Sequence, residues 1–393
     1  MIKSETKPPL NLINVVIFIG FPIAALVLVP LWGIYRGYDG FQWLWALAFL
    51  YLNGLSITGG YHRLWAHQAY EASPALKWFF AFWGAGALQN SILIWASDHR
   101  RHHRYVDNNE LDPYSAGRGL WFSHIGWMLR DYDTNRQDFS NARDLLRDPV
   151  VIWQDKHYVP LTLLMNLGLP LLLGIWHGDI IGTLLLAGLL RLVVNHHVTF
   201  FINSLAHYWG TRPYTETNSA RDNGFLAFLT YGEGYHNYHH IFQTDYRNGI
   251  RWWQWDPTKW MIALCQHLGL ARNLNRVSNF KIQRAILDTA FERARNKLEQ
   301  AQDSESLRGV LEREYQLFTD SINQWTALRA ERYERTKIQL SDALEEGKQQ
   351  LQQKWDNAAL HTKLKTLEYS LKMQRKRLSL FMEQVQFHQA HMA

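Results

Sequence analysis

The stretch NLINVVIFIGFPIAALVLVPLWGIY, residues 11–35, decides the fold class, because it carries no charged side chain over roughly 25 positions. A helix of about 20 apolar residues crosses the hydrocarbon core of a bilayer, so this stretch is long enough to span a membrane. It lacks the small-residue cleavage site of a secretory signal. We therefore expect it to stay in the mature protein as a membrane helix.

Three further apolar stretches follow it. Residues 41–61 are rich in Trp, Leu and Phe, and a short connection containing Arg36 joins them to the first stretch as a helical hairpin. Residues 158–176 and 180–201 flank the tight turn HGD and form a second hairpin. The sequence predicts an all-α integral membrane protein with four transmembrane helices, over about 11–35, 41–61, 158–176 and 180–201.

Residues 76–95 are also aromatic and apolar, but Lys77, Gln89 and Asn90 interrupt them. We interpret this segment as one amphipathic helix that lies on the membrane or against the bundle. A fifth span here would place the two flanking regions on opposite sides of the membrane.

The basic residues predict the orientation. Lys7 precedes the first span, and Arg63, Arg100, Arg118 and Arg130 lie between the hairpins, whereas the outer turns carry almost no positive charge. The positive-inside rule then places both termini and the central loop in the cytoplasm, so the protein is multi-pass with a cytoplasmic functional face, in the inner membrane if the chain is bacterial. The net charge of +6 fits such loops better than nucleic-acid binding, and no nucleic-acid partner is expected.

Histidines gather on the cytoplasmic side of this topology. Half of the 18 histidines lie in the four short stretches HRLWAH, HRRHH, NSLAH and HNYHH: His62, His67, His99, His102, His103, His207, His236, His239 and His240. For the others, taken singly, a surface or hydrogen-bonded role is expected: His124, His157, His177, His196, His197, His267, His361, His388 and His391.

The spacing of the clustered histidines predicts a metal site. In each H-x-x-H-H box the rings stand at i, i+3 and i+4 and share one helix face, from which all three could point into a single pocket. His62 and His67 are five residues apart and would diverge on an ideal helix, so we expect them at a helix end where the chain bends. Asp98 and Glu233 flank the boxes as candidate acceptors that orient the ligands.

The number of imidazoles indicates two ions rather than one. Each ion would take four or five nitrogens and keep open positions, and imidazole suits iron, copper, zinc and nickel. The single cysteine, Cys265, excludes a cysteine-based zinc site. Two redox-active ions with free positions favour iron and dioxygen. Asn203 lies four residues before His207 and is placed to hold a metal-bound water.

The boxes HRLWAH, DHRRHH and GEGYHNYHH resemble the three histidine boxes of the membrane-bound acyl-CoA desaturases of the Δ9 stearoyl-CoA type. TGGYHRLWAH, DPYSAGRGLWFSHIGW, NSLAHYWGTRPY and WDPTKW also resemble stretches of that family in the same order, so the resemblance covers about residues 10–275. It implies a di-iron enzyme that uses dioxygen and two electrons to remove two vicinal hydrogens from a saturated acyl chain. Carried over by motif, the nine clustered histidines would be the iron ligands, and Asn203 would act through water.

The resemblance also implies substrate contacts. Gln89, Asn90, Trp95 and Thr199 match positions along the acyl tunnel of the family, whereas Asp98 and Arg130 match positions near the CoA head group. The chain departs from the family at Ser97 and Asp131, where basic residues are expected, and at Phe200, where a Trp is expected. These departures weaken a site for a phosphate-rich CoA, so a phospholipid-bound acyl chain stays open as the carrier.

Residues 279–393 differ in character from the rest. They contain no proline, and they mix charged residues with Leu, Ile and Ala at helical spacing. We expect long amphipathic helices with breaks near Ser304 and Gly347, forming an extension to a desaturase domain of residues 1–278. KMQRKR, residues 372–377, is a candidate contact for anionic lipid. No electron-carrier motif occurs in the extension, so the two electrons are expected from a separate electron-transfer protein.

Together these features predict an oxygen-dependent desaturase with two Fe²⁺ ions that places a cis double bond at Δ9 in a saturated long-chain acyl-CoA. A fatty-acid or sterol hydroxylase of the same iron class is the first alternative, because it would differ only in how the substrate is positioned. The second alternative is a membrane metal-binding sensor that uses the same histidines without turning over a lipid.

Overall fold

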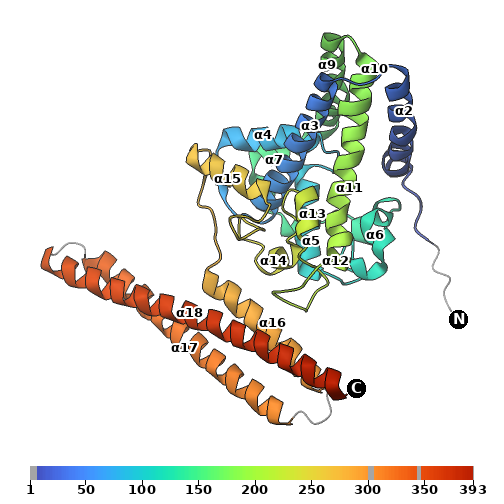
Figure 1. The fold of residues 1–393 in the computed structure, drawn as a ribbon. Helices are drawn as coiled ribbons and strands as arrows, with labels where there is room; N and C mark the ends of the chain where they lie inside the picture. Colours follow the sequence, from blue (N-terminus) through green and yellow to red (C-terminus); the bar gives the residue numbers. More distant parts are fainter. Residues whose placement is uncertain (1–6, 300–304, 343–346, 393) are drawn as a thin grey trace. The chain divides into compact units, whose positions relative to one another are not determined.

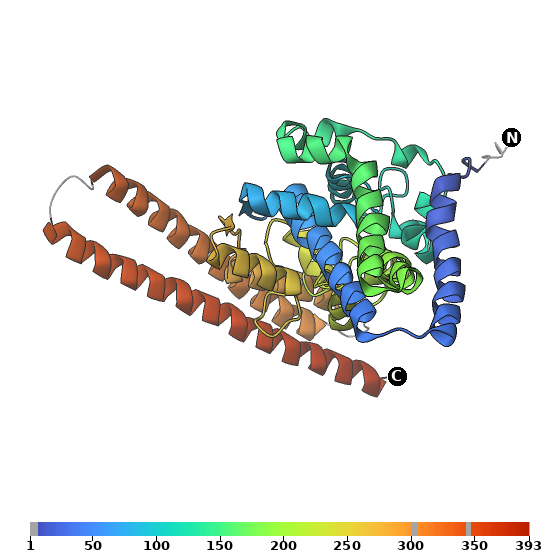
Figure 2. The ribbon, with the colours of Figure 1, turned by 90° about the horizontal axis from the view of Figure 1, so that it is seen from above.

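The computed structural model describes residues 7–299, 305–342 and 347–392. The chain divides into two compact units (Figure 1, Figure 2). The first consists of the residues up to Arg212 together with Thr217–Arg276, and the second consists of Pro213–Glu216 together with the residues from Val277 onward. Helices are the main secondary structure of both units.

Three helices of the first unit are long and apolar enough to cross a membrane: Leu12–Tyr35, Tyr158–His177 and Ile180–Tyr208. They correspond to the spans expected at 11–35, 158–176 and 180–201. Short π-helical turns divide each of them, giving α1 (Leu12–Val15), η1 (Val16–Gly20) and α2 (Phe21–Tyr35), then α8 (Tyr158–Leu163), η8 (Leu164–Gly168) and α9 (Leu169–His177), and finally α10 (Ile180–Thr183), η9 (Leu184–Leu190), α11 (Arg191–Asn203) and α12 (Leu205–Tyr208).

These helices leave many large apolar side chains without protein cover. Leu26 is 76% exposed, Ile34 86% and Trp176 74%. Contiguous exposed apolar surface of this kind marks contact with a membrane or a partner. Figure 1 shows α9 and α10 side by side, connected by the tight turn at Gly178, whose φ of 92° suits glycine.

Residues 41–61 do not form a fourth helix of this kind. They lie in α3 (Gly40–Leu55) and the π-helix η2 (Ser56–Ala66), and the described part of the chain holds no further helix of sufficient apolarity and length. The reason is local: Gln42, Asn53 and Thr58 are buried polar side chains that lower the apolarity of this helix. Gln42, for example, donates to Asp179 at 2.9 Å inside the unit.

The prediction of a single amphipathic helix over residues 76–95 is wrong. The chain instead forms α4 (Pro74–Ala85) and α5 (Ile92–Tyr105) with a turn between them. Leu88 and Asn90 in this turn have φ values of 51° and 74°, which an α-helix does not permit. The break starts a new helix that carries the second histidine box.

The remaining elements of the first unit are short. A two-stranded antiparallel sheet pairs β1 (Glu71–Ala72) with β2 (Ala271–Arg272). The other helices and turns are η3 (Ala116–Arg118), α6 (Leu120–His124), η4 (Gly126–Met128), η5 (Asp133–Asn135), η6 (Phe139–Asn141), η7 (Leu145–Arg147), α7 (Pro149–Lys156), α13 (Gly224–Leu229), α14 (His236–Ile241) and α15 (Pro257–His267).

The main core of the first unit packs η2 against α4, α5 and α15. Tyr61, Phe80, Ile92 and Ile262 are fully buried within it. A Cβ at Gly60 would lie 2.7 Å from the Phe80 side chain, so glycine at this position lets η2 and α4 approach closely. This core fixes the two helices that carry the first and second histidine boxes.

The second unit consists of the long helices α16 (Asn279–Glu299), α17 (Glu305–Asp342) and α18 (Gly347–Met392). Leu287, Phe291, Leu371 and Leu378 belong to their shared apolar core. The long helices predicted for this region are present, and α18 begins at the expected break. The other expected break, Ser304, lies outside the described residues.

Candidate metal centre

Four segments of the first unit supply the nine clustered histidines. His62 lies in η2 and His67 caps its C-terminal end, while the other seven lie in α5, α12 and α14. Their imidazole nitrogens gather into two groups, each with all ligand atoms within 4.8 Å of one another. The five-histidine group is His62, His67, His99, His103 and His239, and the four-histidine group is His102, His207, His236 and His240.

Each H-x-x-H-H box is shared between the two groups. In α5, His99 and His103 join the five-histidine group and His102 joins the other. In α14, His236 and His240 pair in one group and His239 crosses to the other. Residues i and i+4 lie about 40° apart on an α-helix, whereas i+3 lies about 60° away on the other side of i. The expectation that all three rings of a box could enter a single pocket is therefore corrected.

The spacing of five residues between His62 and His67 is accommodated by the π-helix η2 rather than by a bend. The backbone N–H of His67 donates to the carbonyl of His62 at 3.0 Å, a hydrogen bond from i+5 to i. Such a bond closes one turn over five residues, so the two rings lie on the same side of the helix. Their ring centroids are 4.8 Å apart.

The nitrogens of the five-histidine group are spaced like ligands of one ion. The Nε2 atoms of His62 and His239 lie 3.0 Å apart, those of His67 and His99 2.9 Å, and those of His239 and His103 3.0 Å. Two ligands at right angles around an ion about 2.1 Å away are about 3.0 Å apart. A neutral imidazole has one N–H and one lone pair. The Nε2 atom of His239 therefore carries either one hydrogen or one lone pair, which does not supply a full hydrogen bond to both His62 and His103. A shared cation accounts for all these contacts.

The four-histidine group has the same geometry. Nε2 of His236 lies 3.1 Å from Nε2 of both His207 and His240. Nε2 of His102 is buried and has no hydrogen-bond partner among the described residues. A buried nitrogen without a partner is costly in an apoprotein, and a metal ion at this position would satisfy its lone pair.

Carboxylates hold one histidine of each group by the nitrogen that faces away from the centre. Nδ1 of His62 lies 3.0 Å from Glu233, and Nδ1 of His102 lies 2.9 Å from both carboxylate oxygens of Asp112. An Nδ1–H donated to a carboxylate fixes the tautomer and leaves the Nε2 lone pair for a metal. Glu233 also receives a hydrogen bond from Arg63 at 2.9 Å.

The electrostatics of the centre favour neutral rings beside charged carboxylates. Burial would raise the pKa of Glu233, but the electrostatic interactions and hydrogen bonds with His62 and Arg63 outweigh this effect and lower it. Burial, followed by the charges of neighbouring imidazoles, holds a pKa well below the usual value of 6.5 in six of the rings: His67, His99, His103, His236, His239 and His240. Neutral imidazole is the form that binds a metal ion.

Sequence reasoning found Glu233 but missed the other supports. Asp112 was overlooked although it begins the DPY stretch. His207 Nδ1 lies 2.7 Å from the hydroxyl of Ser219, which donates to Asp107. No sequence spacing links these residues to the boxes. Asp98, the other expected support, instead accepts from Arg101 at 2.5 Å, and burial raises its pKa to about 6.

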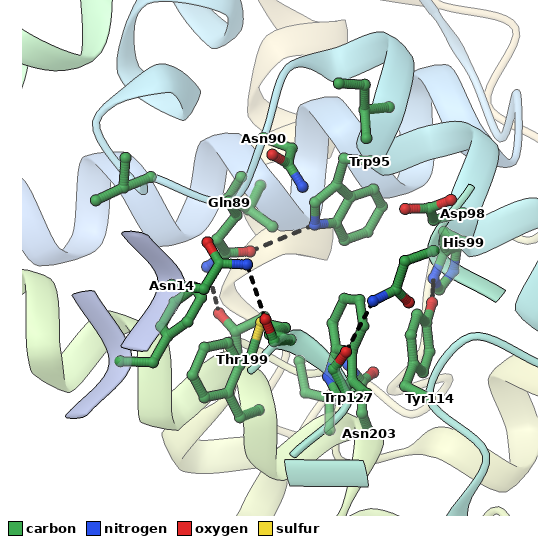
Figure 3. Close-up of a pocket in the computed structure, with 18 of the residues that line it drawn as sticks. Asn14, Gln89, Asn90, Trp95, Asp98, His99, Tyr114, Trp127, Thr199 and Asn203 are labelled. Atoms are coloured by element: carbon green, nitrogen blue, oxygen red, sulfur yellow. Dashed lines mark hydrogen bonds between the residues drawn. The ribbon is translucent and has the colours of Figure 1, made fainter. Parts of the chain in front are cut away.

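One cavity of about 420 Å³ reaches both histidine groups, because His62, His99 and His236 form part of its wall. Its volume lies in the range of small-molecule sites. All six residues expected to contact substrate line this cavity: Gln89, Asn90, Trp95, Asp98, Arg130 and Thr199. Asn203 lines it as well, and Figure 3 labels each of these residues except Arg130.

A hydrogen-bonded chain shapes one wall of the cavity. Trp95 donates to Gln89 at 3.3 Å, and Gln89 donates to Thr199 at 2.9 Å (Figure 3). The indole of Trp95 also stacks on the ring of His99, with centroids 4.9 Å apart. The wall is thereby coupled to the five-histidine group.

The positions that depart from the family pattern have their own partners. Ser97 is buried and donates to Asn141 and to the carbonyl of Asp138. Asp131 accepts from Asn11 at 3.1 Å at the cavity wall. Phe200 is buried and packs against Phe18. None of them adds a positive charge to the cavity.

Several histidines assigned to hydrogen-bonded roles have such partners. His196 lies 2.9 Å from the carbonyl of Ala87, and His177 lies 2.7 Å from Asp39. His124 contacts both Ser204 and His197. None of these belongs to either group. The side chains of His388 and His391 lie outside the described part of the structure.

The first unit is thus a helical protein with membrane-length apolar helices and two imidazole clusters able to hold metal ions. The family model described as "Fatty acid desaturase" matches residues 13–274, which is more than half of the chain. The protein therefore belongs to the fatty acid desaturase family.

Its relatives carry names of that activity. The chain is 45% identical over 245 residues to the "Probable acyl-CoA desaturase" of Schizosaccharomyces pombe, covering 62% of this chain and 51% of the relative. It is 41% identical over 285 residues to "Acyl-CoA desaturase 1" of Saccharomyces cerevisiae, covering 71% and 54%. It is 37% identical over 282 residues to the "sn-2 palmitoyl-lipid 9-desaturase" of Nostoc sp., covering 69% and 93%. The chain spans about half the length of the two fungal relatives.

Proposed function

We propose that this protein is an oxygen-dependent di-iron fatty acyl desaturase that introduces a cis double bond at Δ9 into a saturated long-chain acyl-CoA. The observation that carries the proposal is a single cavity that reaches both histidine groups and is lined by all six expected substrate residues. The reaction balances when the saturated chain, dioxygen, two electrons and two protons give the alkene and two waters. The electrons come from a separate electron-transfer protein.

The nine clustered histidines hold two Fe²⁺ ions, one in each group, and Asn203 acts through a water. Bound iron supplies, with dioxygen and electrons, the oxidising power needed to remove hydrogen from an unactivated chain. The protein's part is positional: Glu233 and Asp112 keep Nδ1 of their histidines protonated, so that Nε2 faces inward. The low pKa of the buried rings keeps them available as ligands near neutral pH.

The cavity positions the acyl chain. Holding the reacting carbons in one place beside the oxidising centre makes removal of two neighbouring hydrogens selective. The wall formed by Trp95, Gln89 and Thr199 is rigid because each side chain is fixed by a hydrogen bond. Enclosure of the chain by protein also excludes water and side reactions.

The membrane arrangement follows from the same proposal. In this proposal four helices cross the bilayer, over about 11–35, 41–61, 158–176 and 180–201, and the helix over 41–61 is the least apolar of them. The histidine groups belong to a desaturase domain of residues 1–278 and face the cytoplasm. Three of these helices have the length and apolarity of spans, and basic residues between the hairpins favour this orientation. An apolar substrate taken from the bilayer explains why the centre is built on membrane helices.

The choice of acyl carrier rests on the names of the relatives and on the charge of the residues near the cavity. Acyl-CoA is the first choice, since both fungal relatives are named for it. The Nostoc relative is named for a lipid-bound chain. Arg130 lines the cavity, but Ser97 and Asp131 stand where two further basic residues would favour a phosphate-rich CoA. Purified protein supplied with an electron source and either stearoyl-CoA or a saturated phospholipid decides between the two carriers.

Expression in a host that lacks unsaturated fatty acids tests the function. Mass spectrometry of the lipids should show a double bond at Δ9, its formation should require oxygen, and iron analysis should give two ions per chain. A hydroxylated product would contradict desaturation and favour the hydroxylase alternative. Metal binding without any lipid turnover would favour the sensor.

A further inference from the structure

The outer side of α18 carries a surface that the family relationship does not explain, because the family match ends at residue 274. Three lysines on this side are exposed, and three large apolar residues on the same side are 64%, 40% and 52% exposed in chain order. This surface, called here the lysine face, consists of Lys365, Tyr369, Lys372, Met373, Lys376 and Leu380.

The lysine face is one continuous stripe of the helix. Its members recur at intervals of three and four residues, which places them on one side of an α-helix. Leu371, Leu378 and Phe381 lie on the opposite side and are buried in the core of the second unit. The stripe is therefore the surface that α18 turns away from its own bundle.

The charge of the lysine face is uncompensated. Within the described ranges, none of its three lysines forms an ion pair, whereas neighbouring Arg377 is paired with Glu314. Acidic residues appear only beside the stripe, at half-buried Glu368, and at its far end, at exposed Glu383. Lysine side chains free of partners leave their positive charge available to an anionic ligand.

We propose that the lysine face binds the anionic phospholipid headgroups of the membrane in which the protein is embedded. Lysines interspersed with exposed apolar side chains on one helix face are typical of helices that lie in a membrane interface. The lysines meet the negative surface charge, while Tyr369, Met373 and Leu380 enter the headgroup region. A nucleic acid would use the lysines but would gain little from the apolar residues, so the mixed composition favours a lipid surface.

The test uses the full-length protein in lipid nanodiscs with a fluorophore beside the lysine face. Ser379 is exposed between Lys376 and Leu380, and the single native cysteine, Cys265, is buried. A Cys265→Ser, Ser379→Cys chain therefore accepts one environment-sensitive label. Discs with 30% phosphatidylglycerol should blue-shift its emission relative to discs of phosphatidylcholine alone, and the shift should weaken in high salt. An identical label at Asn323→Cys on α17 should not respond.

Charge variants separate a specific face from general attraction. Lys365→Gln, Lys372→Gln and Lys376→Gln together should lower the docking equilibrium constant by about 100-fold, at about fivefold per lysine. The matched triple Lys281→Gln, Lys297→Gln and Lys363→Gln removes the same charge elsewhere on the unit and should leave the shift almost unchanged. Equal loss in both triples, or no shift with anionic lipid, would overturn the proposal.

Apolar variants separate lipid from other polyanions. Replacing Tyr369, Met373 and Leu380 by Gln should abolish the blue shift while all lysines remain. If this variant keeps the full shift, or if RNA added to phosphatidylcholine discs produces the same shift in the parent, the lysine face binds polyanions and the lipid proposal fails. Circular dichroism of each variant checks that the helices are intact.

Discussion

The five-histidine and four-histidine groups share α5 and α14 but are stabilised differently. α5 and α14 contribute to both, so neither group can form without the other's scaffold. The five-histidine group has one more nitrogen, and its carboxylate support, Glu233, is anchored by Arg63. The four-histidine group has its carboxylate support at His102 and a hydroxyl, Ser219, at His207. The two sites thus have similar chemistry, but the five-histidine group offers more nitrogen ligands than the four-histidine group.

Removing a ligand tests the comparison most strongly. His239→Ala takes a nitrogen from the five-histidine group, and His102→Ala takes one from the four-histidine group. Both should abolish desaturation, because the proposed reaction uses both ions. Iron analysis should show a larger loss for His102→Ala, since three nitrogens remain there against four in the other group. His361→Ala on exposed surface should change neither quantity.

Full activity in either site variant would contradict the assignment of the groups as the oxidising centre. Membrane insertion of each variant, followed by fractionation, shows whether a loss of activity reflects the site or the fold. Equal iron loss in the two variants would remove the inequality proposed between the groups.

Supporting carboxylates come next in expected effect. Asp112→Asn and Glu233→Gln keep the size of each side chain but weaken the hold on Nδ1 of His102 and His62. Losses of such partners cost about 10–100-fold in metal affinity or activity. The cost should be at the upper end for Asp112→Asn, because the four-histidine group has fewer other ligands. Iron affinity measured by competition with a chelator decides the order, and a larger effect of Glu233→Gln would reverse it.

The sequence predicted the members of both groups but not their division. The spacing i, i+3 and i+4 identifies three histidines on one face of a helix. It does not predict that the histidine at i+3 joins a different group from the histidines at i and i+4. The five-residue spacing of His62 and His67 depends on a π-helix, which is set by tertiary packing of η2 rather than by local propensity. Asp112 and Ser219 act from loops whose positions depend on the folded chain.

The fold shows the same limit. Long uncharged stretches predict apolar helices directly, because a run of about 20 apolar side chains is stable in the hydrocarbon core of a bilayer and not in water. The break between α4 and α5 was missed, since Leu88 adopts a left-handed conformation that leucine rarely takes, and Asn90, although asparagine tolerates this conformation, does not by itself signal a turn. Polar residues inside α3, such as Gln42, pair within the unit, and their partners lie far away in sequence.

A change in the cavity, which both histidine groups border, should have an effect of intermediate size. A Cβ at Gly54 would lie 2.2 Å from the ring of Tyr231, which lines the cavity and donates to the carbonyl of Leu50. Gly54→Ala should push that ring and shorten the space for the chain. Activity on an 18-carbon substrate should fall roughly tenfold relative to a 14-carbon one, as measured by product analysis of mixed substrates.

Gly40→Ala is the matched control for this change, because it lies on the same helix and a Cβ there meets nothing within 4 Å. Its substrate preference should equal that of the parent. An unchanged preference in Gly54→Ala, with normal folding, would show that the substrate does not reach this end of the cavity.

The smallest expected effect concerns the hydrogen bonds of Arg100, which hold α5 against η2. Both of these elements carry ligands of the five-histidine group. Arg100 donates to the carbonyls of Trp65 and Ala66 and forms a paired contact with Asp144 at 2.7 and 2.8 Å. The hydrogen bond from Arg100 is the main cause that lowers the pKa of Asp144 from 3.8. Because Asp144 is partly exposed, the pair contributes only about 0.5–1 kcal/mol. Arg100→Lys should lower thermal stability slightly, whereas Arg101→Lys should not weaken the link to η2.

The pH dependence of this difference identifies its source. A carboxyl group whose pKa is lowered on folding stabilises the protein fully above its ordinary value of 3.8, and this contribution is lost as the pH falls through the lowered value. The stabilities of the parent and Arg100→Lys should therefore differ at pH 7, begin to converge as the pH falls below about 3.8, and become equal once it is below the lowered pKa. If the difference persists in acid, the bonds from Arg100 to the carbonyls of η2, rather than the pair with Asp144, hold the five-histidine group in place.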